Sequence, residues 1–326
     1  NVWAYITRRL LTLIPTLLIV TVLVFLLVSA MPGDITEAVV GQVGHEEVDR
    51  DAVMRHFGLD QPLTVQYGRW MGFLPGSDGR YSGLMQGSLG TSWWTGGEVV
   101  GRITKRWPVT LELGLLALIV AQLVALPLGT WSALRQETLA DYASRSFAIA
   151  AISIPGFWLG TVLIVYPAIW WNHAQPIFYV KFTEDPLANL GILLLPVLIL
   201  GMELSGITTR MVRSMVLEVL RQDYVRTAWA KGLREKTIVI RHTLKNALIP
   251  VVTIVGLQVP IMIGGAVIIE SLFNLPGMGR LLIDAVTNRD EPLVMGLTVL
   301  ISVALVLINL LVDLTYSYLD PRIRYT

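Results

Sequence analysis

The chain contains no cysteine, and only 15% of its 326 residues are charged. The absence of cysteine excludes disulfides, thiolate nucleophiles and cysteine-ligated zinc or iron–sulfur sites. Soluble domains carry about 25% charged residues, whereas this chain has a mean hydropathy of +0.62. A soluble fold of this composition would expose large apolar patches. We therefore expect an integral membrane protein.

Several functional signatures are also missing. The formal net charge is only +1, whereas proteins that bind nucleic acid need a basic excess to neutralise phosphates, so we expect no nucleic-acid partner. The sequence contains no Gly-x-x-x-x-Gly-Lys-Ser/Thr phosphate loop, His-Glu-x-x-His motif or nucleophile elbow. Its four histidines (His45, His56, His173 and His242) show no ligand spacing. We expect no catalytic residue, metal site or cofactor on this chain.

Six apolar runs are long enough to cross the ~30 Å hydrocarbon core as helices of ~20 residues. They are Leu10–Met31, Val109–Ala133, Phe147–Trp171, Leu190–Ile207, Ala247–Ile269 and Leu293–Val312. The runs are continuously apolar rather than alternating, which favours helices over a β-barrel. We expect an all-α membrane fold with six transmembrane helices. The first run is longer than the ~7–15 apolar residues of a signal peptide, so we expect it to be retained.

Lysine and arginine indicate the orientation. Most of them fall in segments that are cytoplasmic if the N-terminus lies inside, namely Arg8, Arg9, Arg135, Arg145, Arg210, Arg213, Arg221, Arg226, Lys231, Arg234, Lys236, Arg241, Lys245, Arg322 and Arg324. Arg102, Lys105 and Arg106 run against this trend, but they belong to a long loop whose charges have little topological weight. The positive-inside rule therefore places both termini in the cytoplasm.

Residues 32–108 form an insertion of different character, rich in glycine. Its acidic residues include Asp34, Glu37, Glu46, Glu47, Asp49 and Asp51. Apolar spacing predicts helices at Glu46–Phe57 and Leu63–Leu74. Two interpretations stay open: a docking surface for an extracytoplasmic partner, or a small cap on the helix ends. Trp93 and Trp94 fit an interfacial aromatic belt or a contact with that partner.

The loop 210–250 is the most informative region. The fourth span is expected to continue beyond Arg210, followed by a short helix from Tyr224 to Lys231 that stops at Gly232, a C-cap glycine. A second basic helix, about Glu235–Asn246, leads into the fifth span. Small Ala228 and Ala230 make the short helix slim enough to enter a cleft of another protein. A basic loop that touches anionic lipid is the alternative.

Ionisable residues inside membrane spans are costly and are functional candidates by default. Glu203 lies within the fourth span, where it either lines a pathway or pairs with Arg210. Pro155-Gly156 and Gly160 predict a kink and close helix packing, with substrate contact as the alternative. Glu112 and Asp313 lie near the ends of spans, where a structural role is favoured.

Ordered sequence strings carry a family resemblance. Asp223-Tyr-Val-Arg-Thr-Ala-Trp-Ala-Lys-Gly-Leu233 and Arg241-His-Thr-Leu-Lys-Asn-Ala-Leu-Ile-Pro-Val251 resemble the coupling segment of ABC importer permeases. The chain is similar to the first (B-type) permease of the dipeptide, oligopeptide and nickel branch over nearly its whole length. Further matching strings are Met31-Pro-Gly-Asp34, Phe57-Gly-Leu-Asp-Gln-Pro62, Gly87-Ser-Leu-Gly-Thr-Ser92, Pro108-Val-Thr-Leu-Glu-Leu113, Ser153-Ile-Pro155, Phe273-Asn-Leu-Pro-Gly-Met-Gly-Arg280, Asn288-Arg-Asp290 and Asp320-Pro-Arg-Ile-Arg324.

The sequence departs from the general pattern in three places. Arg226-Thr227-Ala228 stands where the generic motif has Glu-Ala-Ala, and the distance from Gly232 to Pro250 is longer than the generic one. Both features resemble the peptide branch's own variant. Ser88 stands where the family usually has Asp, so no role is assigned to it.

The resemblance implies an ATP-driven importer, most simply for di- or oligopeptides, in a prokaryotic plasma membrane. The expected partners are a second permease, two cytosolic ATPases that hold ATP and magnesium, an extracytoplasmic binding protein and membrane lipid. The ATPase-coupling residues would be Tyr224, Arg226, Thr227, Ala228, Ala230, Lys231, Gly232 and Leu233. Pathway candidates are Glu203, Pro155 and Gly156, and binding-protein candidates are Trp93 and Trp94.

The expected organisation is a first helix in 1–31, an extracytoplasmic insertion in 32–108, a permease core in 109–320 that contains the coupling loop 210–250, and a tail in 321–326. Relatives of this branch also carry nickel chelates, glutathione and oligosaccharides. Two other hypotheses stay open: an ion-coupled secondary transporter with Glu203 as its coupling carboxylate, and a membrane scaffold that transports nothing.

Overall fold

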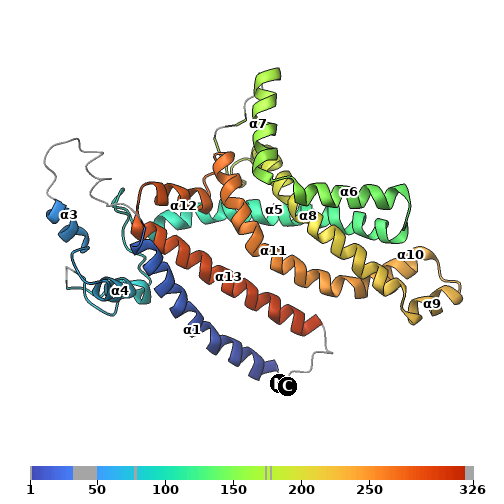
Figure 1. Ribbon diagram of the computed structural model, residues 1–326, viewed down its shortest axis with the longest axis horizontal. Coiled ribbons are helices and arrows are strands. Elements are labelled where there is room, and N and C mark those ends of the chain that lie inside the picture. The colour runs from blue at the N-terminus through green and yellow to red at the C-terminus, as the bar shows by residue number, and fades with distance from the viewer. Residues whose placement is uncertain (1, 32–49, 77–78, 173–174, 177, 320–326) are drawn as a thin grey trace. The chain divides into compact units, whose positions relative to one another are not determined.

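The computed structural model describes residues 2–31, 50–76, 79–172, 175–176 and 178–319 (Figure 1). Its α-helices are α1 (Val2–Ser29), α3 (Arg50–Phe57), α4 (Leu63–Met71), α5 (Val99–Leu134), α6 (Leu139–Ser153), α7 (Gly156–Trp171), α8 (Pro186–Leu220), α9 (Asp223–Ala230), α10 (Glu235–Thr237), α11 (Lys245–Leu272), α12 (Met278–Thr287) and α13 (Glu291–Leu319). Within these ranges the only β-pairing is an isolated bridge between Thr91 and Glu98. The predicted all-α membrane fold is confirmed.

Five segments are long and apolar enough to cross a membrane, and a bent pair of helices adds a sixth. The five are Leu11–Ser29, Val99–Leu134, Pro186–Leu220, Glu235–Leu272 and Glu291–Val312. The pair is α6 with α7, which meet at an angle of 89° (Figure 1). The expected third span, Phe147–Trp171, therefore corresponds to α7 and the C-terminal half of α6, with the break between them.

The break between α6 and α7 has a local cause. Ile154 precedes a proline, whose ring disfavours helical backbone in the residue before it. Ile154 accordingly has extended dihedrals (φ −86°, ψ 115°), and Pro155 follows with ψ 130°. The kink expected at Pro155-Gly156 is confirmed, but it redirects the chain instead of bending one span slightly.

The second basic helix expected at Glu235–Asn246 is not a separate element. The chain runs from α10 through a π-helical stretch, Ile238–Leu244, directly into α11. Such π-helical turns are rare and often occur at functional sites. The start expected for the fifth span, Ala247, is therefore too late.

The described chain forms two compact units, and the first contains residues 109–172, 175–176, 178–280 and 307–319. Helices α5, α8 and α11 share one apolar core, and α6 packs against α8. Along α5 the buried residues recur every fourth position, as Val109, Leu113, Ala117 and Ala121. This spacing places them on one helix face.

Glycines allow close helix packing in this unit. A Cβ on Gly206 of α8 would lie 2.8 Å from the Ala148 carbonyl oxygen of α6, and one on Gly129 of α5 would lie 2.8 Å from the Thr209 carbonyl oxygen of α8. A Cβ on Gly160 of α7 would likewise lie 2.5 Å from Leu272 Cδ2. The packing role predicted for Gly160 is therefore confirmed. Small residues at membrane helix contacts allow such approach.

The described part of the second unit contains residues 2–31, 50–76, 79–108 and 281–306. There α4 packs on α1 through Tyr67, whose hydroxyl lies 2.9 Å from the Thr21 hydroxyl and whose ring lies 5.3 Å from that of Phe25. The helix expected at Leu63–Leu74 is present and ends at Met71, where Gly72 caps it with φ +85°. The helix expected at Glu46–Phe57 is described from Arg50 onward.

Some expectations fall outside the described residues. These are the positions Pro32, Gly33, Asp34, Glu37, His45, Glu46, Glu47, Asp49 and His173, the terminal string from Asp320 to Arg324, and the side chain of Asp313. Those predictions stay predictions.

Candidate functional site

Helix α9 is a short two-faced helix in the loop between α8 and the π-helical stretch. Val225 and Ala228, three residues apart, are buried in a small cluster with Ile238, against which Val219 and Leu220 pack. The opposite face is exposed and consists of Tyr224, Arg226, Thr227, Trp229, Ala230 and Lys231. The side chains of Tyr224 and Trp229 are 44% and 47% exposed. An aromatic and basic face is thus free to meet a partner.

The structure gives Ala228 a different place from the one that the slim-helix argument assumed. Its side chain is only 5% exposed and points into the chain's own cluster. Its small size therefore suits packing of α9 onto α8, and the outward face carries larger side chains. Of the two small residues, only Ala230 is exposed.

The end of α9 is set by Gly232. Its φ of +73° lies in the left-handed region, which favours glycine. The Gly232 N–H donates to the Trp229 carbonyl oxygen at 2.9 Å, and the Leu233 N–H donates to the Ala228 carbonyl oxygen at 3.3 Å. These two bonds form a Schellman motif. The predicted C-cap glycine is confirmed.

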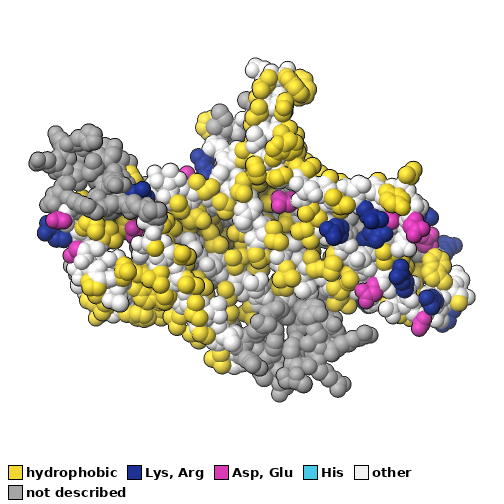
Figure 2. All heavy atoms as spheres, viewed as in Figure 1, with side chains coloured by type: hydrophobic (Ala, Val, Ile, Leu, Met, Phe, Trp, Pro, Cys, Tyr) yellow, Lys and Arg dark blue, Asp and Glu magenta, His cyan; other side chains and the backbone are white. Residues whose placement is uncertain are grey.

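The π-helical stretch and the first turn of α11 support α9. Asn246 Nδ2 donates to the Tyr224 hydroxyl at 2.8 Å, and that hydroxyl donates to the His242 carbonyl oxygen at 3.3 Å. Ile238, the first π-helical residue, is fully buried beneath α9. Figure 2 shows lysine and arginine gathered at the end of the unit that carries α9 and α10 (right), whereas α7 is mainly hydrophobic. α9 is thus held in place by the residues that follow it in the loop as well as by α8.

A buried ion pair lies within the same unit and joins three helices. Arg213 of α8 binds Asp141 of α6 in a bidentate manner, with Nε–Oδ1 and Nη2–Oδ2 distances of 2.8 and 2.9 Å. Ser132 of α5 donates to the same carboxylate at 2.5 Å. Asp141 is 1% exposed. Removing one partner of a buried pair costs roughly 3–5 kcal/mol, so α5, α6 and α8 are tied together firmly.

A second buried carboxylate, Glu270, closes the end of α11. It accepts hydrogen bonds from the Thr110 hydroxyl at 2.6 Å and from the N–H groups of Gly279 and Arg280 at 2.8 and 3.1 Å. The last two belong to the first turn of α12, where a carboxylate satisfies unpaired donors and the helix dipole. A Cβ on Gly277 would lie 2.1 Å from the carboxyl carbon. This explains the glycine in the Phe273–Arg280 string.

Glu203 and Arg210 are both on α8, and the structure does not pair them. Among the described residues, no ion pair or hydrogen bond joins either side chain to a partner. A Cβ on Gly156, at the α6–α7 break, would lie 3.1 Å from Glu203 Oε2. The structure therefore brings Glu203 and Gly156 together, whereas Pro155 contributes by breaking the helix between α6 and α7. Arg210 is exposed and lines a groove with Ile152 and Ile254.

Glu112 has a structural environment. The Tyr179 hydroxyl donates to its carboxylate at 2.7 Å, and Asn189 Nδ2 lies 3.5 Å from the same oxygen. Asn189 also donates to the Val180 carbonyl oxygen at 2.9 Å. Burial, and then the bond to Glu112, raise the pKa of Tyr179 above its ordinary value, so the phenol stays a donor. The contacts tie the loop before α8 to α5.

Trp93 and Trp94, the candidates for contact with a binding protein, have partners inside their own unit. Asp290, 1% exposed, accepts from the Ser92 hydroxyl at 2.5 Å and from the Trp93 N–H at 3.1 Å. The Trp94 indole N–H donates to the Asn288 carbonyl oxygen. The Trp93 ring lies 4.7 Å from the Phe57 ring. Both tryptophans are half-buried, so they stabilise the loop, and their role in docking stays a prediction.

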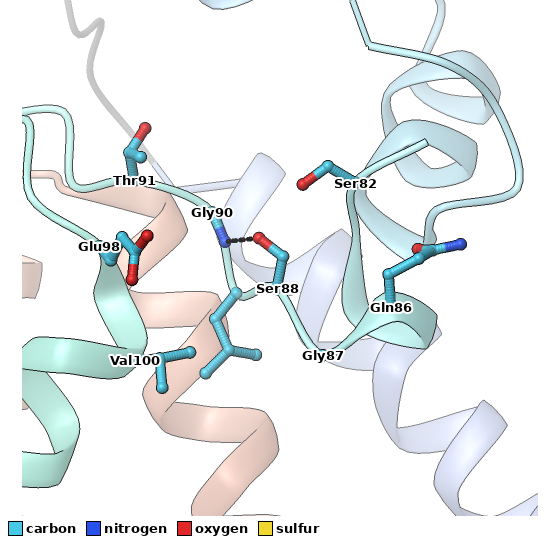
Figure 3. A pocket seen from close by; sticks show the side chains of 9 residues that line it. Ser82, Gln86, Gly87, Ser88, Gly90, Thr91, Glu98 and Val100 are labelled. Atoms are coloured by element: carbon cyan, nitrogen blue, oxygen red, sulfur yellow. Dashed lines mark hydrogen bonds between the residues drawn. The ribbon is translucent and has the colours of Figure 1, made fainter. Parts of the chain in front are cut away.

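A polar pocket of about 500 Å³ lies next to this loop, within the second unit. Figure 3 shows Thr91 and Glu98 on one side and Ser82 on the other, with Ser88 between them accepting a hydrogen bond from the Gly90 N–H at 3.3 Å. Residues Gly87–Thr91 of the Gly87–Ser92 string therefore form a pocket wall. No group of three or more His, Asp or Glu that could hold a metal ion occurs in the described part of the chain.

Sequence reasoning missed three buried carboxylates: Asp141, Glu270 and Asp290. Arg213 was counted only as a positive-inside charge, and the fifth span was ended one residue before Glu270. A usable signal exists for Glu270, because an acid three residues before a Phe-Asn-Leu-Pro-Gly turn can cap the following helix. For Asp141 and Arg213, 72 residues apart, the local pattern carries no such signal.

Comparisons with known proteins agree with this architecture. The family described as "Binding-protein-dependent transport system inner membrane component" matches residues 125–325, and its N-terminal counterpart matches residues 2–114. The chain is 37% identical over 326 residues to the oligopeptide transport system permease protein AppB of Bacillus subtilis, with 99% of each chain covered. It is 36% identical to the dipeptide transport system permease protein DppB of Escherichia coli K12, with 98% of each covered.

Solved structures share the fold at lower identity. An inward-facing structure of the MetNI methionine ABC transporter superposes with a TM-score of 0.51 and 15% identity, and covers 68% of this chain and 97% of that one. A second MetNI crystal form gives a TM-score of 0.52 at 16% identity, with 67% and 96% covered. The chain therefore belongs to the family of binding-protein-dependent transport system inner membrane components, alongside the AppB and DppB permeases.

Proposed function

We propose that this permease imports di- or oligopeptides into the cytoplasm and that α9 couples it to cytosolic ATPases. The single observation that carries the proposal is the geometry of α9. Its exposed face carries Tyr224, Trp229 and Lys231, and its inner face packs on the chain's own helices. A partly exposed tryptophan and tyrosine on a short helix are typical anchors of a protein–protein interface. The peptide substrate rests on the similarity to the AppB and DppB permeases.

The proposed complex contains this chain, a second homologous permease, two ATPases and an extracytoplasmic binding protein. ATP and magnesium would be bound by the ATPases, since this sequence has no phosphate-binding loop. Nucleotide-driven closure of the ATPases would move α9, and the buried cluster beneath α9 would pass that movement to α8 and the π-helical stretch. The Asp141–Arg213 pair would carry it on from α8 to α6.

The proposed orientation has both termini in the cytoplasm. It rests on the concentration of lysine and arginine from Arg210 to Lys245. In this orientation the insertion lies outside, where the polar pocket and the loop of Trp93 would face the binding protein. Because the chain has no native cysteine, single cysteines placed at Thr227 and Ser82 would report the side of the membrane through an impermeant thiol reagent.

Transport in proteoliposomes tests the function. The full complex is reconstituted with ATP on the α9 side and the binding protein with radiolabelled trialanine on the other. We expect uptake that requires both ATP and the binding protein. Uptake driven by a proton or sodium gradient without ATP would instead support the secondary transporter, and ATPase binding without any uptake would support the scaffold.

A further inference from the structure

Two unpaired charges of opposite sign share one face of α8. Glu203, Ile207, Arg210, Met211 and Ser214 follow one another at offsets of 4, 7, 8 and 11 residues, which places them on one side of a helix. Neither charged side chain has an ion-pair or hydrogen-bond partner within the described residues. Arg213, one turn away from Arg210, is by contrast fully paired with Asp141. Glu203 lies within the fourth span, and unpaired ionisable groups in a membrane span usually mark a substrate or ion route.

Arg210 lines a groove of about 490 Å³. Its walls come from three helices, with Ile152 of α6, Ile207 and Met211 of α8 and Ile254 of α11, and its other polar residue is Ser214. A few polar groups in an apolar groove of this size are typical of a site for a small ligand. Figure 2 shows isolated acidic and basic side chains within the largely hydrophobic surface over α6 and α8.

Glu203 lies one helical turn from Ile207 and next to the α6–α7 break. A Cβ on Gly156 would approach its Oε2 to 3.1 Å, so the glycine leaves room for the carboxylate at this bend. The groove therefore has a cationic group at Arg210 and apolar walls, and the Glu203 carboxylate lies outside its lining, one helical turn before Ile207 on the same face of α8. A lone anion or a lone cation would satisfy only one of the two charges.

We propose that this face of α8 binds short zwitterionic peptides, with Glu203 on the terminal ammonium and Arg210 on the terminal carboxylate. The proposal rests on the proposed function and names how the substrate is held. The two positions are seven residues apart in sequence, which corresponds to a rise of ~10.5 Å, and an extended chain covers ~3.3 Å per residue. Peptides of two to four residues match that separation, and apolar walls tolerate varied side chains.

Each charge suits its proposed partner. A guanidinium binds a carboxylate through two parallel hydrogen bonds, and a carboxylate accepts from an ammonium. In an apolar groove such bonds are stronger than in water. The site thus recognises what all free peptides share and ignores what differs among them.

Uptake by the full importer in proteoliposomes tests the proposal with trialanine and trialanine amide. Arg210→Gln is expected to raise the half-saturating concentration of trialanine at least fivefold while changing that of the amide less than twofold. Glu203→Gln should affect both peptides, because both keep a free amino terminus. The matched control is Arg145→Gln, since Arg145 is an exposed arginine of α6 outside the groove, and it should leave both values unchanged. Equal effects of Arg210→Gln on both peptides, or none, would overturn the proposal.

Thiol protection gives a second readout that needs no transport. Ser214→Cys in this cysteine-free chain should react with a hydrophilic methanethiosulfonate reagent, and millimolar trialanine should slow the reaction at least threefold. N-acetyl-trialanine amide, which lacks both charges, should not slow it. Protection by both peptides or by neither would contradict recognition of the termini. Absence of any trialanine uptake by the unmodified importer would instead contradict the proposed function itself.

Discussion

Two short segments of this chain carry tryptophan, and they differ in where their polar groups find partners. In the segment Thr91–Trp94, Asp290 and Asn288 bind the Ser92 hydroxyl, the Trp93 N–H and the Trp94 indole. In α9, Trp229 is 47% exposed, and the helix is held by the buried Val225 and Ala228 and by the hydrogen bonds of the Tyr224 hydroxyl. The polar groups of Thr91–Trp94 are thus bound by the chain itself, whereas Trp229 of α9 faces outward. Aromatic residues in a polar loop indicate docking only when their own chain leaves them free.

The largest effect is expected from releasing the Thr91–Trp94 segment. Asp290→Ala leaves the Ser92 hydroxyl and the Trp93 N–H without their acceptor, at about 1–3 kcal/mol for each unsatisfied buried group. The midpoint of thermal unfolding of the detergent-solubilised complex should fall by several degrees. The control is Asp223→Ala, since the Asp223 side chain is 97% exposed, and it should leave the midpoint unchanged. Equal midpoints for the two variants would contradict the claim that Asp290 stabilises the segment Thr91–Trp94 more than the exposed Asp223 stabilises α9.

The next effect separates docking from stability. Trp229→Ala should weaken binding of the ATPase by roughly tenfold or more, because truncating a tryptophan anchor costs about 2 kcal/mol or more. Its thermal midpoint should not change. Trp94→Phe should instead lower the thermal midpoint and leave ATPase binding unchanged, because it removes one hydrogen bond worth about 0.5–1.5 kcal/mol. Surface-immobilised ATPase and a thermal melt measure the two quantities, and a lowered midpoint for Trp229→Ala would count against an outward-facing role.

Gly232 tests the backbone at the end of α9. Gly232→Val forces a β-branched residue into φ +73°, at a cost of about 1–2 kcal/mol. Peptide uptake should fall by roughly tenfold, since 1.4 kcal/mol corresponds to a factor of ten. Apart from its two chain neighbours, no heavy atom of the described residues lies within 4 Å of a Cβ built at this position, so the effect is one of conformation and not of volume. Gly232→Asn, which tolerates left-handed backbone, should retain most of the uptake.

The smallest effect is expected at Arg226. Its Nη1 lies 3.6 Å from Asp223 Oδ1, with side-chain exposures of 72% and 97%. Exposed pairs of this kind contribute about 0–1 kcal/mol. Arg226→Ala should therefore leave the thermal midpoint within about 1 °C, the range expected for a few tenths of a kcal/mol. A larger drop would mean that α9 depends on this pair rather than on the Val225–Ala228 face.

Local features of the fold could be predicted from the sequence. Apolar run length located the spans, Gly232 marked the end of α9, and Pro155 marked the break in the third span. The size of that break, 89°, could not be predicted, because it depends on how α6 and α7 pack against α8. The π-helical stretch was missed for a similar reason: the register of Ile238 is set by its burial under α9.

The position of α9 in the sequence was predictable, but which of its faces is buried was not. Motif spacing located the α9 segment, but the burial of Ala228 depends on Val219, Leu220 and Ile238, which no local pattern reveals. The buried carboxylates depend on partners far away in sequence: Asp141 and Arg213 are 72 residues apart, and Thr110 and Glu270 are 160 apart. A single sequence shows the charge of such residues and conceals their pairing.

Photocrosslinking tests the central claim most directly. A photoreactive phenylalanine analogue is placed at Thr227, on the exposed face of α9, or at Trp94, in the Thr91–Trp94 segment, in the full importer in native membranes. We expect an adduct between the Thr227 position and an ATPase subunit, changed in yield by ATP, and none between the Trp94 position and that subunit. Failure of the Thr227 position to reach the ATPase, with the complex intact, would contradict that claim.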